Sequence, residues 1–183
     1  TFQRLMDAVL NGLSLQICLA YLDDVVVFSR SIEEHLDRLR QVLERLPAAG
    51  LKLKPSKCSI LQRRVAFLGH IVSSEGIATD PEKIRAVMDW PVPGCVKDVR
   101  AFVGLASYYR KFVQGFAEIA SPLHALMKKD VKFKWDEDHQ RAFERLKQAL
   151  IEAPILVTPD DEHTFILDTD ASNHSMGAVL SMV

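Results

Sequence analysis

The stretch from residue 15 to residue 28, LQICLAYLDDVVVF, decides the fold of this chain. It consists of two runs of apolar and β-branched residues that are interrupted only by Asp23 and Asp24. Such runs around a short polar break are typical of a buried β-hairpin, here with the acids in its turn. Two adjacent carboxylates in an apolar hairpin are costly to desolvate unless a cation such as Mg²⁺ compensates them. The other interpretation is that the Asp-Asp pair only shapes the turn.

Helical periodicity surrounds this hairpin. Apolar residues at helical spacing predict a helix over residues 2–10 and another over 32–46, and a capping box at Ser31 begins the second. Short strand-like pieces are expected at 51–53 and 65–72. Helices and strands therefore mix without a regular repeat, which predicts an α+β fold.

The second half of the chain begins as a small helical module. Residues 79–82 carry a helix start with proline at the first helical position, and apolar spacing predicts helices over 96–113 and 119–127. Asp136 is placed to cap one more helix. Two adjacent strands are then expected at 164–172 and 177–183.

Charge is distributed unevenly, although the formal net charge is only −1. Residues 76–134 carry 10 basic and 6 acidic side chains, whereas residues 135–183 carry 3 basic and 10 acidic ones. A basic segment can meet phosphates, and clustered aspartates suit metal ions. No apolar run approaches the roughly 18 residues that cross a bilayer, so no membrane partner is expected.

A series of short motifs runs along the chain. Tyr21-Leu22-Asp23-Asp24 resembles the active-site hairpin of reverse transcriptases. Further segments follow it: LKLKPSKCSI at 51–60, FLGHIVSSEGI at 67–77, the stretch 80–93, RAFVGLASYYRKFV at 100–113 and the later FKW, AF, LK and AP elements. In their order, and over essentially the whole chain, these segments resemble gypsy-type LTR retrotransposon polymerases. The resemblance implies three parts: the C-terminal part of a polymerase palm over 1–75, a helical thumb over 76–130, and the truncated start of a ribonuclease H-like domain over 131–183.

The resemblance also implies an activity. The parent enzyme is expected to be an RNA-directed DNA polymerase with an attached ribonuclease H, each site using two Mg²⁺ ions. Its partners would be an RNA template, a DNA primer, the RNA–DNA hybrid, deoxynucleoside triphosphates and the remaining polyprotein segments. The family's first palm aspartate lies upstream of the hairpin and would fall before Thr1, so the isolated chain is expected to be an inactive internal fragment. Cytoplasmic retroelement particles are the expected location.

Site residues follow from the same resemblance. Asp23 and Asp24 match the metal-binding carboxylates of the hairpin, and Asp170 in TFILDTDASNHSMGAVL matches the first catalytic aspartate of ribonuclease H. Lys57 matches a lysine-rich loop and would donate a proton to pyrophosphate. Its other interpretation is a solvated loop cation. The primer grip would consist of Phe67, Leu68, Gly69 and His70.

Residues 108–111, Tyr-Tyr-Arg-Lys, place aromatic and cationic groups side by side. This combination suits packing on sugars and contacts with phosphates, so Arg110 and Lys111 are candidate nucleic-acid contacts. At helical spacing, one of the two tyrosines should instead face the core.

Two alternatives to the enzyme remain open from the sequence. One is a non-catalytic product of a decayed or domesticated retroelement that binds nucleic acid or a partner. The other is a helical interaction domain whose acids are structural.

Overall fold

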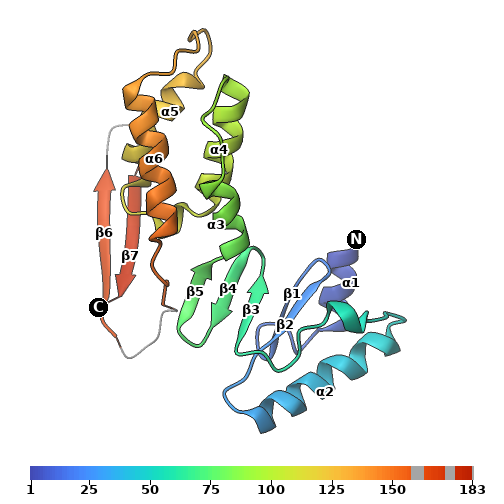
Figure 1. Cartoon of the computed structure of the whole chain (residues 1–183). Helices are drawn as coiled ribbons and strands as arrows, with labels where there is room; N and C mark the ends of the chain where they lie inside the picture. The colour runs from blue at the N-terminus through green and yellow to red at the C-terminus, as the bar shows by residue number, and fades with distance from the viewer. Residues whose placement is uncertain (158–162, 172–175, 183) are drawn as a thin grey trace.

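The structure is a computed structural model, and it describes residues 1–157, 163–171 and 176–182. Its elements form three successive groups along the chain, which Figure 1 shows from blue to red. The first group is a hairpin with two helices, the second a three-stranded sheet with four α-helices, and the third a two-stranded ribbon. This arrangement confirms the predicted α+β fold.

The first group surrounds the YLDD hairpin. It contains α1 (Phe2–Val9), β1 (Cys18–Tyr21), β2 (Asp24–Val27) and α2 (Ile32–Ala48). The Ser31 side chain accepts a hydrogen bond from the Glu34 N–H and so caps α2, as predicted. One small apolar core joins the four elements, with buried Met6, Leu10, Leu13, Cys18, Val42 and Leu46.

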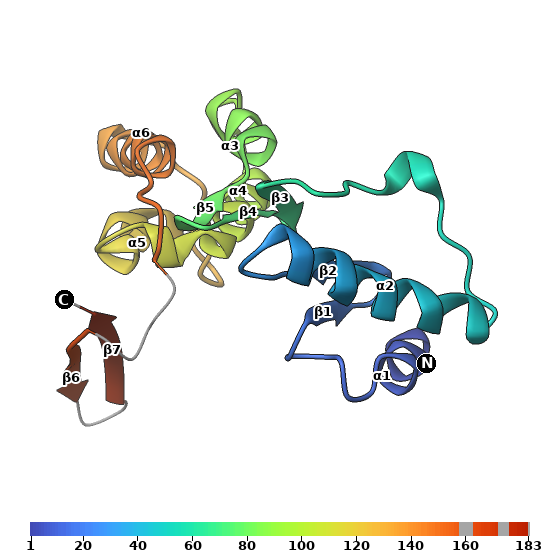
Figure 2. The same ribbon diagram turned by 90° about the horizontal axis from the view of Figure 1, so that it is seen from below.

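A long connection leads from α2 to the second group, and Figure 2 shows it passing along the outside of α2. Its one regular element is the short 3₁₀ helix Pro55–Lys57. The strand predicted at 51–53 is wrong, because residues 51–54 form neither strand nor helix and pair with no neighbouring strand.

A three-stranded antiparallel sheet opens the second group, with β3 (Arg64–Phe67), β4 (His70–Ser73) and β5 (Gly76–Thr79). A single strand piece over 65–72 was predicted, and this is wrong. Leu68 and Gly69 adopt left-handed backbone angles, with φ of 48° and 68°, and reverse the chain in a tight turn. The strand β5 was not predicted at all.

Four α-helices pack against one another in a second, larger core. They are α3 (Pro81–Met88), α4 (Val96–Tyr108), α5 (Phe116–Leu126) and α6 (Glu137–Ile151). Helix α3 begins as predicted, with Pro81 at its first position, and the Asp80 side chain caps it by accepting the Glu82 N–H. Asp136 caps α6 as predicted, in a capping box with His139. Helix α6 falls in the segment predicted to begin the ribonuclease H-like domain, yet it packs on the helices before it; the domain boundaries stay predictions.

The segment after α6 returns to the sheet. Ile77 of β5 and Leu156 exchange both backbone hydrogen bonds, each 2.8 Å long. The third group, β6 (Phe165–Ala171) and β7 (Met176–Met182), then forms an antiparallel ribbon close to the two predicted strands. Within the described ranges, no helix has the length and apolar character needed to span a membrane.

Gly76 is required where β5 meets Leu156. Its φ is 129°, and a Cβ there would lie 2.3 Å from the Leu156 carbonyl oxygen. Gly76→Ala is therefore expected to lower the free energy of unfolding by about 2 kcal/mol or more. Urea unfolding followed by tryptophan fluorescence measures this effect, because Trp90 and Trp135 both pack on the helical core.

The matched control is Gly104→Ala in α4. A Cβ at Gly104 would meet no atom within 4 Å, and the helical backbone favours alanine. This change is expected to stabilise the chain by about 0.5–1 kcal/mol. Equal effects of the two substitutions would contradict the proposed clash at Leu156.

Candidate active site and nucleic-acid interface

The turn of the first hairpin is held by helix α1. Tyr21 pairs with Asp24, so Leu22 and Asp23 form a two-residue loop, and Leu22 adopts a left-handed φ of 53°. Gln3 of α1 reaches this loop: its Oε1 accepts the Leu22 N–H, and its Nε2 donates to the Ala20 carbonyl oxygen at 3.3 Å. These bonds offset the strain of a left-handed leucine.

Both hairpin carboxylates are exposed to solvent. The apolar runs suggested a buried turn, but full burial in the hairpin is confined to its base at Cys18, and burial raises the pKa of that thiol. Desolvation therefore does not force a cation onto Asp23 and Asp24. The case for a metal rests instead on the adjacency of two carboxylates at an open turn.

A divalent ion fits this donor set in part. Among the residues that the structure describes, no group of three or more histidine, cysteine, aspartate or glutamate side chains is placed to hold a metal. Among the described residues, Asp23 and Asp24 thus offer two carboxylate groups, with no third side chain of these types beside them. Mg²⁺ commonly binds one or two protein carboxylates and takes its other ligands from water and substrate phosphates.

The predicted primer grip is the turn between β3 and β4. Phe67 pairs with His70, and Leu68 and Gly69 form the loop. The loop lies against the C-terminal end of α4: the Tyr109 hydroxyl donates to the Gly69 carbonyl oxygen at 2.7 Å, and the Tyr108 hydroxyl donates to the Leu68 carbonyl oxygen.

The two tyrosines differ in burial, as predicted. Tyr109 is fully buried in the helical core, whereas Tyr108 is 50% exposed. Burial of the Tyr109 phenol, with smaller contributions from the charges of Asp80 and Tyr108, raises its pKa to about 12. Its hydroxyl therefore remains a donor at physiological pH.

Arg110 and Lys111 follow directly in a 3₁₀ helix over Arg110–Phe112. Both side chains are exposed, and the Lys111 ammonium lies 5.1 Å from the centre of the Phe112 ring. The structure thus brings the predicted phosphate contacts close to the predicted primer grip. Lys57 is also exposed, in the connection after α2, and its predicted role stays a prediction.

The aspartates of β6 are placed only by their backbone register. Asp168 pairs with Val179, and Asp170 pairs with Gly177. Asp168 is exposed, whereas the side chain of Asp170 lies outside the described part of the structure. The predicted catalytic role of Asp170 stays a prediction.

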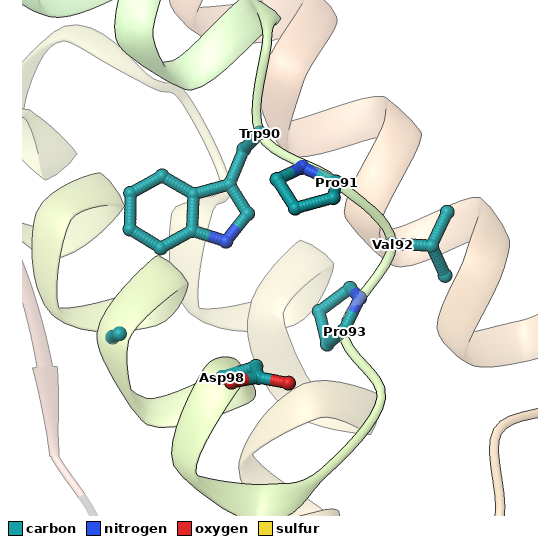
Figure 3. A pocket seen from close by; sticks show the side chains of 6 residues that line it. Trp90, Pro91, Val92, Pro93 and Asp98 are labelled. Atoms are coloured by element: carbon teal, nitrogen blue, oxygen red, sulfur yellow. The ribbon is translucent and has the colours of Figure 1, made fainter.

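A hollow of about 370 Å³ lies where the loop after α3 meets α4. Figure 3 shows Trp90, Pro93 and Asp98 around it. Hydrogen bonds from Cys95 and from the Gly94 N–H hold the pKa of Asp98 below its ordinary value, so this carboxylate is occupied in fixing the loop. The hollow contains none of the predicted site residues.

Sequence reasoning missed three residues that position these sites. Gln3 acts on a turn 19 residues away, and Tyr108 and Tyr109 act on a turn 40 residues away. The sequence predicts that the aromatic groups at 108 and 109 pack on sugars, but no local pattern indicates the carbonyls to which the two tyrosines donate.

Two family profiles match the chain. "Reverse transcriptase (RNA-dependent DNA polymerase)" matches residues 1–72, and "RNase H-like domain found in reverse transcriptase" matches residues 135–183. Both families are generally dependent on divalent metal ions.

Curated relatives align along nearly the whole chain. The Pol polyprotein from transposon 297 of Drosophila melanogaster is 46% identical over 182 residues, covering 99% of this chain and 17% of the relative. The gypsy polyprotein of the same fly is 40% identical, covering 98% and 19%, and the Tf2-3 polyprotein of Schizosaccharomyces pombe is 35% identical, covering 98% and 14%. The chain therefore spans less than a fifth of these relatives.

Solved structures of reverse transcriptases also resemble this chain. The foamy viral protease-reverse transcriptase in complex with RNA/DNA hybrid superposes with a TM-score of 0.84 at 25% identity, covering 98% of this chain and 25% of that one. Its complex with dsDNA gives 0.83 at 26% identity, covering 99% and 38%. The fold of the chain and its YLDD hairpin are thus those of a reverse transcriptase. The chain belongs to the reverse transcriptase–ribonuclease H region of LTR-retrotransposon Pol polyproteins.

The raised pKa of Tyr109 predicts a pH-dependent stability. Because the folded pKa of about 12 exceeds the unfolded value of 10.0, the contribution of Tyr109 is fully present below pH 10 and is lost as pH rises toward 12. The stability difference between wild type and Tyr109→Phe should therefore shrink by about 2 kcal/mol between pH 9 and pH 12.

Urea unfolding at a series of pH values measures this difference. Ser107→Ala is the control, since it alters the same helix and leaves all tyrosines in place; its difference from wild type should not change with pH. A constant difference for Tyr109→Phe would show that the phenol is not held protonated by the fold.

Proposed function

We propose that this chain is the part of a reverse transcriptase–ribonuclease H in which Asp23 and Asp24 bind Mg²⁺ for DNA synthesis on an RNA template. The observation that carries the proposal is the YLDD turn, which presents two adjacent, exposed carboxylates on a loop fixed by Gln3. An Mg²⁺ ion there has ligand positions left for the phosphates of a deoxynucleoside triphosphate. Bound Mg²⁺ would supply charge stabilisation during nucleotidyl transfer, two ions serving each site.

The nucleic-acid partners we propose are an RNA template, a DNA primer and their hybrid. Support comes from the foamy viral neighbours, which were solved with dsDNA and with RNA/DNA hybrid. Phe67–His70 would hold the primer end, and exposed Arg110 and Lys111 would contact phosphates. Lys57 would donate a proton to the pyrophosphate.

We further propose a second activity, hydrolysis of the RNA strand of the hybrid, with Asp170 as a metal ligand. The match of residues 135–183 to an RNase H-like profile supports it. Other polyprotein segments would supply the remaining carboxylates. Cytoplasmic retroelement particles are the location we propose.

The polymerase proposal is tested by primer extension. The chain would replace the matching region of the transposon 297 polyprotein, with which it shares 46% identity. The chimaera is expected to extend a DNA primer on an RNA template with Mg²⁺ and to stop when EDTA removes the metal. Asp23→Asn and Asp24→Asn should each lower the extension rate by about 100-fold or more, because each removes a ligand charge.

Asp37→Asn is the matched control. Asp37 is exposed on α2, where it accepts a hydrogen bond from Gln41, so its loss should leave extension within about twofold, as surface substitutions usually do. A chimaera that binds hybrid but never extends it would instead identify a nucleic-acid-binding module. Extension unaffected by Asp23→Asn and Asp24→Asn would exclude the YLDD metal site.

Asp170→Asn tests the second activity in the same chimaera. It is expected to lower RNA-strand cleavage of a labelled hybrid by about 100-fold or more, since removal of a metal ligand costs several kcal/mol of transition-state stabilisation. Primer extension should be retained. Asp168→Asn is its control on the same strand, and equal loss of cleavage by both variants would contradict the assignment of Asp170.

A further inference from the structure

The turn between β3 and β4 has a conformation that needs support from outside the sheet. Leu68 and Gly69 are both left-handed, and this backbone conformation is unfavourable for leucine. The pairing of Phe67 with His70 ends the ladder, so the carbonyls of Leu68 and Gly69 have no partner on a neighbouring strand. Both accept hydrogen bonds from the end of α4 instead.

The support comes from two consecutive tyrosines. Neighbouring residues on a helix face different directions, yet Tyr108 and Tyr109 both reach this one turn. Helix α4 ends at Tyr108, and the backbone of Tyr109 leaves the helix with φ −100° and ψ 13°. The two rings lie 4.9 Å apart at 89°, so they meet edge to face and present one hydroxyl to each carbonyl.

His70 completes the contact. Its Nδ1 lies 2.8 Å from the Leu68 carbonyl oxygen and must donate, because a carbonyl only accepts. Its ring is surrounded by Tyr108, Tyr109 and Phe112 at centroid distances of 5.2, 5.6 and 5.7 Å. Its Nε2 is buried without a hydrogen-bond partner in the described structure, so ring packing rather than full hydrogen bonding places this side chain.

The position of Gly69 shows that the turn lies close against the Tyr108 side chain. A Cβ at this position would lie 3.3 Å from the Tyr108 hydroxyl oxygen, and the φ of 68° disfavours any side chain. A side chain at this position would therefore crowd the Tyr108 ring. Arg110 and Lys111 follow Tyr109 directly, so the same contact sets their position relative to the turn.

We propose that Tyr108 and Tyr109 are positioning residues that lock the turn of residues 67–70 onto helix α4, so that this turn and the exposed pair Arg110 and Lys111 bind a primer–template duplex as one rigid unit. The inference rests on the proposed function, since it assigns these residues to the grip on the primer. The Tyr109 ring fills the core, and the hydroxyls of both tyrosines fix the carbonyls of the turn.

The test uses Tyr108→Phe/Tyr109→Phe, which keeps both rings and removes only the hydroxyls. In the chain itself, hydrogen–deuterium exchange of residues 67–70 should accelerate about 2- to 10-fold for each lost hydrogen bond. Exchange in the β1–β2 hairpin should stay unchanged. Ser107→Ala removes a hydroxyl from the same helical turn and is expected to leave exchange at 67–70 as in wild type.

The second measurement uses the transposon 297 chimaera. In the double variant, KM for primer–template should rise about fivefold or more, while kcat with saturating primer–template stays within about twofold, because the loss falls on placement of the duplex. Faster exchange together with this split supports the proposal. Unchanged exchange at 67–70 would show that the hydroxyls do not hold the turn and would overturn the proposal. Faster exchange with unchanged KM would show that the contact is only structural, which also overturns the proposal.

The proposed function and the positioning role of the two tyrosines can be rejected independently of each other. If the wild-type chimaera neither binds nor extends primer–template, the proposed function is wrong, and the assignment to primer binding falls with it. The exchange measurement still decides whether the tyrosines hold the turn. If the wild-type chimaera extends and only the KM effect is missing, the proposed function stands and the positioning role is rejected.

Discussion

The burial of the Tyr109 ring in the helical core, with its hydroxyl directed at the Gly69 carbonyl, is the contact on which the placement of the proposed nucleic-acid interface depends. The ring is fully buried, and a buried hydroxyl without a partner would cost about 1–3 kcal/mol. Packing of the ring in the core and hydrogen bonding of its hydroxyl therefore require the same geometry. Any shift of the β3–β4 turn away from α4 would expose the ring or leave the hydroxyl unpaired, so the sheet follows the helices.

The hairpin with the carboxylates depends on a different, smaller core. Six buried residues join α1, β1 and α2, and none of them belongs to the helical core. The exposed acids do not stabilise this hairpin, since two adjacent carboxylates repel each other. Gln3 instead provides its stability at the turn, through bonds to Leu22 and Ala20. The carboxylates are thus free of structural duties, which is what a site for a shared metal ion requires.

The sequence-based predictions are accurate where the interacting residues are close in the sequence, and they fail where the contacts join distant segments. Helices are set by local periodicity and caps, and the caps at Ser31 and Asp136 were located correctly. The 65–72 hairpin was missed because its turn contains a leucine in a left-handed conformation, which tertiary contacts stabilise and local propensity disfavours. The Asp23-Asp24 pair stands out in the sequence because adjacent acids in an apolar run are a local signal, and its role in metal binding stays a prediction. The exposure of the two carboxylates was not predicted, because it depends on how the two strands lie against distant helices.

Helix α6 shows how the two matched regions are physically connected. It lies within the segment matched by the RNase H-like profile, yet Phe143 packs on Phe102 of α4 with ring centroids 4.5 Å apart. The chain after it then pairs Leu156 with Ile77 of the sheet that carries the predicted primer-grip turn. A displacement of α6 would strain both contacts at once. Since β6 follows this segment in the chain, the aspartates of the ribbon are tethered to the same sheet that would hold the primer, and the contacts of Phe143 and Leu156 fix where that tether begins.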